Sequence, residues 1–198
     1  MAGRMSRTDR RTQLIELGVT LLATRSLDQL ALEDVAAAAG ISRALPFHYF
    51  PTRRDFLVAV LESAAEELLA AGDPAPELPA PERLRAGLEG YVDYIETNPA
   101  AYIAIVRGAA GADQELVAVC DRTRSAIVER ILDGLNPSER NGRVALAVRG
   151  WVGMVEEAAV TWLRDRSIAS RGHLIAWLAE AFVLTVAAAG APSLKEDR

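Results

Sequence analysis

Residues 31–55 read ALEDVAAAAGISRALPFHYFPTRRD, and this stretch decides the fold. Its first half carries apolar residues at the spacing of one helix face: Leu32, Val35, Ala36 and Ala39. This spacing predicts a short helix, which Gly40 ends at the usual C-terminal glycine position. Ser42 is a candidate N-cap for another short helix that ends near Phe50. Because only Gly40-Ile41-Ser42 separates the two helices, they meet at a steep angle, as in a helix-turn-helix, although an ordinary corner in a helical bundle has the same spacing.

The sequence on both sides of this stretch also has helical periodicity. Further helices are predicted over residues 8–24, 52–70, 81–97, 98 to the glycines at 108 and 111, 113–134, 139–165 and 170–189. Thr52-Arg53-Arg54-Asp55 has the form of a capping box. Residues 72–81, GDPAPELPAP, contain four prolines and mark the clearest break in the chain. We therefore predict an all-α fold of about nine helices.

The charge of the chain is unevenly distributed. The 198 residues carry a net charge of −5, which argues against nucleic acid as a partner of the whole. Residues 1–60, however, hold eight arginines against six acidic residues, whereas the rest holds 14 basic against 21 acidic residues. The basic N-terminal part therefore keeps DNA binding open.

Other features exclude several classes of protein. The single cysteine, Cys120, cannot form a disulfide within the chain, and no secretory signal is visible. The apolar stretch Leu174–Ala191 is alanine-rich and contains Glu180, so it predicts a buried helix rather than a membrane span. His48, His173 and Cys120 are too scattered for a metal site or a catalytic set. We expect a cytoplasmic protein without membrane contact, catalytic residues, metal or cofactor, and not an enzyme.

Four sequence motifs point to a known family: Glu33-Asp34-Val35-Ala36, Ala39-Gly40-Ile41-Ser42, Phe47-His48-Tyr49-Phe50 and Thr52-Arg53. With them, residues 8–62 resemble the TetR family of bacterial transcriptional repressors. The resemblance implies a homodimer with a helix-turn-helix DNA-binding domain over residues 1–52, including a basic arm over 1–11. Residues 53–198, which match only in helix pattern, would form the ligand-binding and dimerisation domain. The implied function is that of a repressor released from a palindromic double-stranded DNA operator by a small effector.

Three positions depart from the family pattern. Leu30-Ala31 stands where a Thr or Ser usually caps the second helix and often contacts a phosphate. Pro46 removes a backbone hydrogen bond, so the recognition helix is expected to begin late or to bend. Phe47 replaces a common tyrosine and lacks its hydroxyl group.

The predicted DNA-binding residues are Arg43, Ala44, Leu45, His48, Tyr49, Thr52 and Arg53. Arg43 can bind guanine with two hydrogen bonds and Leu45 can contact a thymine methyl group, whereas His48 contacts a base or a phosphate, or is merely solvated. Tyr49, Thr52 and Arg53 match family positions that bind phosphate.

Two further expectations concern charge and packing around these residues. Arg53 lies at a helix N-terminus, where a cation opposes the helix dipole and suggests an external anion. The arginines of the arm either bind DNA or form a solubilising tail: Arg4, Arg7, Arg10 and Arg11. Ile41, Phe50 and, in part, Phe47 are expected to face the core.

The C-terminal half provides two further sets of candidate residues, and each member has plain core packing as its alternative. The predicted ligand-binding residues are Tyr91, Tyr94, Tyr102, Trp151 and Met154. Because few positive charges accompany them, we expect a small apolar or aromatic effector, with Glu156 or Glu157 available to a cationic group. The predicted dimerisation residues, in the last two helices, are Trp162, Leu174, Trp177, Leu178, Ala181 and Phe182. Two alternative functions stay open: a helical ligand-binding protein or enzyme without DNA binding, and a TetR-like activator without a ligand.

Overall fold

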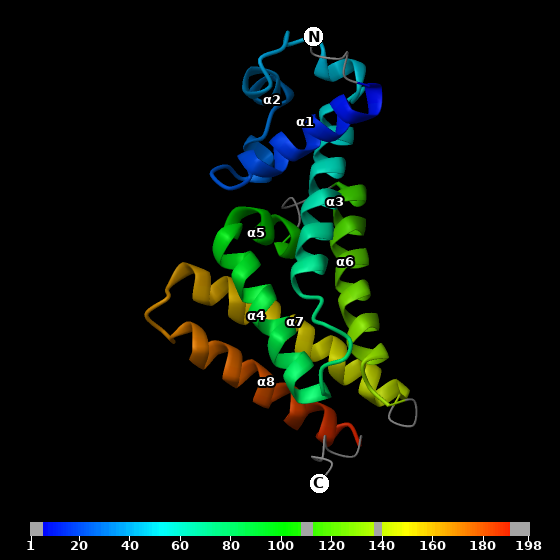
Figure 1. Ribbon diagram of the computed structural model, residues 1–198, viewed down its shortest axis with the longest axis vertical. Helices are drawn as coiled ribbons and strands as arrows, with labels where there is room; N and C mark the ends of the chain where they lie inside the picture. The colour runs from blue at the N-terminus through cyan, green and yellow to red at the C-terminus, as the bar shows by residue number, and fades with distance from the viewer. Residues whose placement is uncertain (1–5, 108–112, 137–139, 191–198) are drawn as a thin grey trace. The chain divides into compact units, whose positions relative to one another are not determined.

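The computed structural model describes residues 6–107, 113–136 and 140–190, and all regular structure in these ranges is helical. The elements, labelled in part in Figure 1, are α1 (Arg7–Leu21), η1 (Leu27–Gln29), α2 (Leu32–Ala38), η2 (Pro46–His48), α3 (Arg53–Ala71), α4 (Ala80–Thr97), α5 (Pro99–Arg107), α6 (Gln114–Asp133), α7 (Gly142–Arg164) and α8 (Arg171–Ala188). The predicted all-α class is confirmed. Of the predicted helices, the short one between Ser42 and Phe50 is not an α-helix but the 3₁₀ turn η2. Gly108 and Gly111, predicted to end a helix, lie outside the described residues.

The chain folds as two compact units. The N-terminal unit comprises residues 1–67 and 98–120, and the C-terminal unit comprises residues 68–97 and 121–198. Helices α3 and α6 therefore contribute residues to both units, and α5 belongs to the N-terminal one. The predicted limits, 1–52 and 53–198, do not coincide with these units. As a division of function they stay a prediction.

The N-terminal unit has a continuous apolar core, in which α1 packs against α2 and α2 against η2. Its fully buried side chains include Leu14, Leu22, Leu30, Leu32, Val35, Phe50 and Phe56. The rings of Phe50 and Phe56 meet edge to face, with centroids 5.2 Å apart. At Gly18 a Cβ atom would lie 2.5 Å from Val60 Cγ2 and 2.9 Å from Phe56 Cζ, so α1 reaches α3 only because this residue has no side chain.

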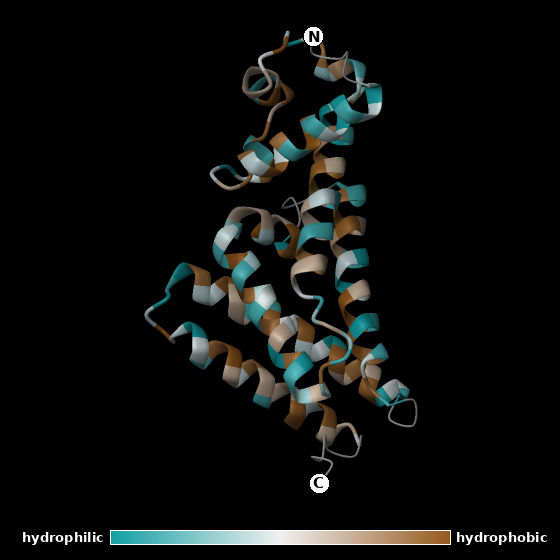
Figure 2. Cartoon of the chain, viewed as in Figure 1, coloured by the Kyte–Doolittle hydropathy of each residue, from teal (hydrophilic) through white to brown (hydrophobic). Residues whose placement is uncertain are grey.

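In the C-terminal unit, α8 packs against both α4 and α7. The Trp151 indole N–H of α7 donates to the Leu178 carbonyl of α8 at 3.0 Å, and the Trp151 and Phe182 rings meet edge to face. By length and composition alone, α8 is the one described helix apolar enough to cross a membrane, and Figure 2 shows its many apolar residues. It places one face in the core of this unit through Leu174, Ile175, Leu178, Phe182 and Val186.

Candidate functional site

The turn after α2 is fixed by backbone hydrogen bonds. The N–H of Gly40 donates to Ala37 O at 3.2 Å, and the N–H of Ile41 donates to Ala36 O at 3.0 Å. This pair of bonds is the Schellman motif, which needs a left-handed residue just after the helix. Gly40 meets this need with φ of 65°. The predicted helix end is therefore confirmed. At the other end of α2, Ala31 makes no capping bond through its side chain, as its chemistry requires.

The segment that follows is a run of 3₁₀-type turns rather than an α-helix. An α-helix from Ser42 would need the N–H of residue 46 to donate to Ser42 O, and proline has no N–H group. Instead, the N–H of Leu45 donates to Ser42 O at 3.0 Å and that of His48 to Leu45 O at 3.0 Å, and a single bond of the α-helical type, from Phe50 N–H to Pro46 O at 2.9 Å, closes the segment. Ser42 thus accepts with its carbonyl and does not cap a helix. The predicted short helix between Ser42 and Phe50 is therefore reduced to η2, which begins only at Pro46.

This backbone changes which side chains face solvent. Arg43, Ala44 and His48 are exposed, and Leu45 and Tyr49 are half-buried. Phe47, which was expected to pack in the core only in part, is 44% exposed. Pro46 takes the buried position instead, together with Phe50, whereas Ile41 is half-buried. Phe47 is therefore exposed together with Arg43, Ala44 and His48. Pro46 was the feature of the sequence that could have predicted this, because a 3₁₀ turn rotates the following side chains relative to an α-helix.

Arg43 differs from its neighbouring arginines because no partner holds it in the described part of the chain. Arg25 pairs with Asp34 at 2.6 Å, and Arg54 pairs with Asp113 at 2.6 Å. Arg11 lies over the Phe50 ring, 5.1 Å from its centroid. The guanidinium group of Arg43 is therefore available to an external partner, as a base-reading arginine has to be.

Thr52 begins α3 with the predicted capping box. The backbone N–H of Thr52 donates to Asp55 Oδ2 at 2.9 Å, and the N–H of Asp55 donates to Thr52 Oγ1 at 3.1 Å. The Thr52 hydroxyl also donates to Asp55 Oδ2 at 2.8 Å. Because a hydroxyl group has one proton, Thr52 can donate to a phosphate only after this bond breaks.

Arg53 lies beside the carbonyl groups of the segment that precedes α2. Its Nε donates to Leu30 O at 3.0 Å and its Nη2 to Asp28 O at 2.6 Å, with Leu27 O at 3.5 Å. The predicted reason for a phosphate contact was that an unfavourable cation at a helix N-terminus needs an external anion, and this reason is wrong in part. The hydrogen bonds have internal partners, although the charge meets no carboxylate in the described residues. The phosphate contact itself stays a prediction.

In the described part of the predicted basic arm, residues 7–11 are helical. Arg7, Arg10 and Arg11 lie in the first turns of α1, whose N-cap Ser6 accepts from Asp9 N. The first helix therefore begins at Arg7, inside the predicted arm. Arg4 lies outside the described residues.

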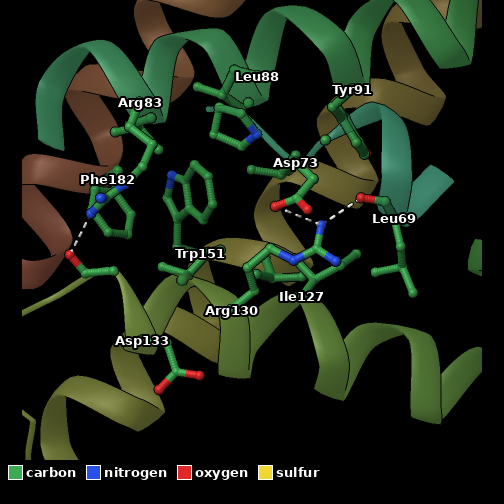
Figure 3. A pocket seen from close by; sticks show the side chains of 18 of the residues that line it. Leu69, Asp73, Arg83, Leu88, Tyr91, Ile127, Arg130, Asp133, Trp151 and Phe182 are labelled. Atoms are coloured by element: carbon green, nitrogen blue, oxygen red, sulfur yellow. Dashed lines mark hydrogen bonds and ion pairs between the residues drawn. The ribbon is translucent and has the colours of Figure 1, made fainter. Parts of the chain in front are cut away.

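The C-terminal unit contains a cavity of about 340 Å³ (Figure 3). Its apolar walls come from the end of α3 and from α4, α6, α7 and α8, and they include Leu68, Leu69, Leu84, Leu88, Tyr91, Ile127, Ile131, Trp151, Val152, Val155 and Phe182. Five charged residues also line it: Asp73, Arg83, Arg130, Asp133 and Glu156. In Figure 3 the Trp151 indole lies between Arg83 with Phe182 on one side and Arg130 with Asp73 on the other. The volume and mostly apolar lining are typical of small-molecule sites.

The structure brings only part of the predicted ligand set together. Tyr91 and Trp151 line this cavity. Met154 lies on another face of α7, and Tyr94 is buried without lining the cavity. Tyr102 is fully buried in the N-terminal unit, so the predicted convergence of three tyrosines is wrong. The expectation of few positive charges also needs correction, because Arg83 and Arg130 line the cavity.

The predicted dimerisation residues divide into two groups. Trp162, Leu174, Leu178 and Phe182 are at most 5% exposed within the single chain and pack mainly in its own core, although Trp162 and Leu174 also line a hollow beside Trp177. Phe182 lines the cavity instead. Trp177 is 45% exposed and Ala181 is half-buried. Sequence periodicity indicated the apolar helices correctly, but it did not separate their inner face from their outer one.

An outward apolar surface does exist on α7, α8 and the turn between them. Its exposed members include Leu146, Ile168, Trp177 and Leu184. Gly150 and Gly153 are exposed on α7, and a Cβ atom at either would meet open space. Glycine inside a helix lowers stability by about 1 kcal/mol relative to alanine, and contacts within this chain give no reason for it here.

Two family models match the sequence. The model described as "Bacterial regulatory proteins, tetR family" matches residues 14–60. The model described as "Tetracyclin repressor-like, C-terminal domain" matches residues 79–185, which is more than half of the chain.

Similar proteins include one of known structure. A TetR-family transcriptional regulator from Streptomyces coelicolor has a TM-score of 0.85 and 31% identity, over 94% of this chain and 84% of that chain. The HTH-type transcriptional activator FasR of Mycolicibacterium smegmatis is 23% identical over 170 residues, or 83% of this chain and 78% of FasR. The HTH-type transcriptional regulator EthR of the same organism is 29% identical over 102 residues, 50% of this chain and 47% of EthR.

Proposed function

Because this chain belongs to the TetR family of transcriptional regulators, and so is a DNA-binding regulator rather than an enzyme, we propose that it acts as a homodimer that a small ligand releases from DNA. The cavity of the C-terminal unit is the observation that carries this proposal. A regulator without a ligand would be expected to fill such a space with side chains, because protein interiors are close-packed. The proposed location is cytoplasmic, where the DNA is.

DNA contact is proposed through η2 and the residues on either side of it. Arg43 supports this proposal because it is exposed and has no partner among the described residues, and His48 and Phe47 are exposed beside it. Arg43→Ala should weaken binding to the preferred site by about 1–3 kcal/mol and relax one base position. The preferred site can be selected from fragments of genomic DNA, and fluorescence anisotropy then measures the affinity of both chains for it. An equal loss on all sequences would assign Arg43 to phosphate instead.

The dimer is proposed through the outward surface of α7 and α8. Exposed Trp177 and Leu184, together with two exposed glycines at which a second helix can approach closely, support this surface. Trp177→Glu should convert the dimer to a monomer in sedimentation at micromolar concentration and abolish binding to a palindromic site. Glu62→Gln, on α3, is the control that leaves the dimer intact. A monomeric wild-type chain that binds DNA normally would refute the proposal.

We propose repression as the sign of regulation. The similar protein FasR is named an activator, so the sign needs its own test. A reporter gene placed behind the selected operator should be more active in cells that lack this protein. Lower reporter activity in those cells would assign activation.

A further inference from the structure

The charged side chains that line the cavity are not all neutralised. Each lining acid has an arginine partner: Asp73 pairs with Arg130 at 3.5 Å, Asp133 with Arg140 at 3.1 Å and Glu156 with Arg124 at 2.9 Å. Two of these partners, Arg124 and Arg140, do not line the cavity. Arg83 is left as the lining cation that meets no carboxylate within 4.0 Å in the part of the chain that the structure describes. Arg83 therefore carries a positive charge that no carboxylate in these residues offsets, although the lining as a whole holds three acids and two arginines.

Carbonyl groups hold Arg83 in place without cancelling its charge. Its Nη2 donates to Gly134 O at 2.7 Å, and its Nη1 donates to Pro76 O at 3.4 Å. A guanidinium group has five N–H donors, so these bonds orient the side chain and leave further donors. The Arg83 side chain is half-buried, so water solvates its charge less well than it would at a fully exposed site.

We propose that the effector is an apolar molecule that carries a carboxylate, and that Arg83 binds this carboxylate. The proposal rests on the ligand-responsive function above and names the chemical class of the ligand. A carboxylate would supply the missing negative charge and accept the remaining N–H groups of Arg83. Leu88, Val152 and Phe182 would contact the apolar body. A neutral apolar ligand would instead cover a half-buried cation without compensating it.

Matched acids and amides test the proposal. The probes are decanoate with decanamide and 2-naphthoate with 2-naphthamide, titrated calorimetrically into the full chain at neutral pH. We expect at least one acid to bind roughly 10- to 100-fold more tightly than its amide, the range of a charged hydrogen bond. Arg83→Gln should abolish this preference, and Arg83→Lys, which keeps the charge, should retain part of it. Arg85→Gln is the control: Arg85 is exposed on the same helix, pairs with Glu89 at 3.0 Å and does not line the cavity.

Three results would overturn the proposal: equal binding of acid and amide, a preference that survives Arg83→Gln in a chain that is folded by circular dichroism, or no binding of either acid at millimolar concentration. Measuring whether the ligands release the protein from its operator separates failure of the carboxylate proposal from failure of the proposed function. Amides that release DNA as well as acids do would refute the carboxylate and leave ligand response intact. Acids that bind at Arg83 without releasing DNA would support the site and refute its role as a switch.

Discussion

Each unit of this protein depends on a glycine at a close approach and on an arginine among carbonyl groups, and the surroundings of these residues differ between the units. In the N-terminal unit, the space beside Gly18 is filled by the tips of two side chains. In the C-terminal unit, a Cβ atom on Gly90 would lie 2.0 Å from the backbone oxygen of Ala71. Side-chain tips can rotate away, whereas a helix carbonyl cannot move without its helix. The two glycines should therefore tolerate substitution to different degrees.

The two arginines make similar bonds for different purposes. Arg53 donates to carbonyls of Leu30 and Asp28, and Arg83 donates to those of Gly134 and Pro76. Neither meets a carboxylate in the described residues, so each is positioned while its charge stays available. Arg53 is exposed beside η2, where DNA phosphate is the proposed anion, and Arg83 lines a cavity, where a ligand carboxylate is. Hydrogen bonds to carbonyl groups thus fix the position of an arginine side chain without neutralising its charge.

The largest effect is expected for Gly90→Ala. Because the added methyl group would overlap a backbone oxygen, α4 has to move away from the end of α3, and we expect a loss of about 3 kcal/mol or more in the free energy of unfolding. Urea unfolding followed by circular dichroism measures this. Gly142→Ala is the control, since its Cβ meets open space, it lies at the first residue of α7, and the substitution should be neutral or stabilising. A Gly90→Ala chain as stable as the wild type would contradict the geometry of this wall.

Gly18→Ala should cost less, about 1–3 kcal/mol, because Val60 and Phe56 can repack around a methyl group. The same urea measurement gives the value. Combining Gly18→Ala with Val60→Ala tests the cause. If Val60 Cγ2 is the obstacle, the double substitution should cost less than the sum of the two single ones. Strict additivity would show that Val60 is not the obstacle and would leave the Phe56 ring, 2.9 Å from the same Cβ position, as the group that has to move.

Arg53→Ala should lower both stability and DNA affinity. Loss of its bonds to the carbonyls before α2 should cost about 1–2 kcal/mol in urea unfolding. DNA binding should weaken alike for all sequences, because a phosphate contact reads no base. Arg43→Ala is the matched control, since it should change stability by no more than about 0.5 kcal/mol. Full DNA affinity in a destabilised Arg53→Ala chain would limit Arg53 to a structural role.

The two regions were also unequally predictable from sequence. Around η2 the signals are local: Gly40 ends a helix, Thr52 and Asp55 form a capping box, and Pro46 removes one bond. Each acts within four residues, so a sequence pattern reveals it. The exposed share of Phe47 was not predictable in the same way, because its orientation was taken from an α-helix that Pro46 prevents.

The cavity has no such local signature. Its walls come from the end of α3 and from four other helices, so sequence spacing does not determine which aromatic residues meet. Tyr102 shows the consequence: it lies five residues after helix α4, which lines the cavity, yet it is buried in the other unit. The partners of Arg53 and Arg83 were unpredictable for a further reason, because they are backbone carbonyls and every residue has one.

The smallest effect concerns Arg54, which adjoins Arg53 and, unlike it, has a carboxylate partner. The Nε–H of Arg54 donates to Asp113 Oδ2 at 2.6 Å, and this bond lowers the pKa of the Asp113 carboxyl below its usual range. Because the folded chain holds this proton less tightly than the unfolded chain does, the pair contributes its full stability above the ordinary aspartate pKa. That contribution is lost as the pH falls through the lowered pKa. The pair is exposed, so the effect is small.

Asp113→Asn isolates this contribution, since an amide oxygen can still accept from the backbone N–H groups of Glu115 and Leu116, as Asp113 Oδ1 does. Its stability, measured by urea unfolding from neutral to acid pH, should fall less steeply than that of the wild type. Asp165, in the C-terminal unit, provides the comparison, because the Ser167 hydroxyl and N–H lower its pKa without a cation. Salt at about 1 M should therefore reduce the effect of Asp113→Asn and leave that of Asp165→Asn unchanged. Equal salt dependence at both positions would show that the Arg54 charge contributes nothing, and that Arg54 holds Asp113 by its hydrogen bond alone, as Arg53 holds its carbonyls.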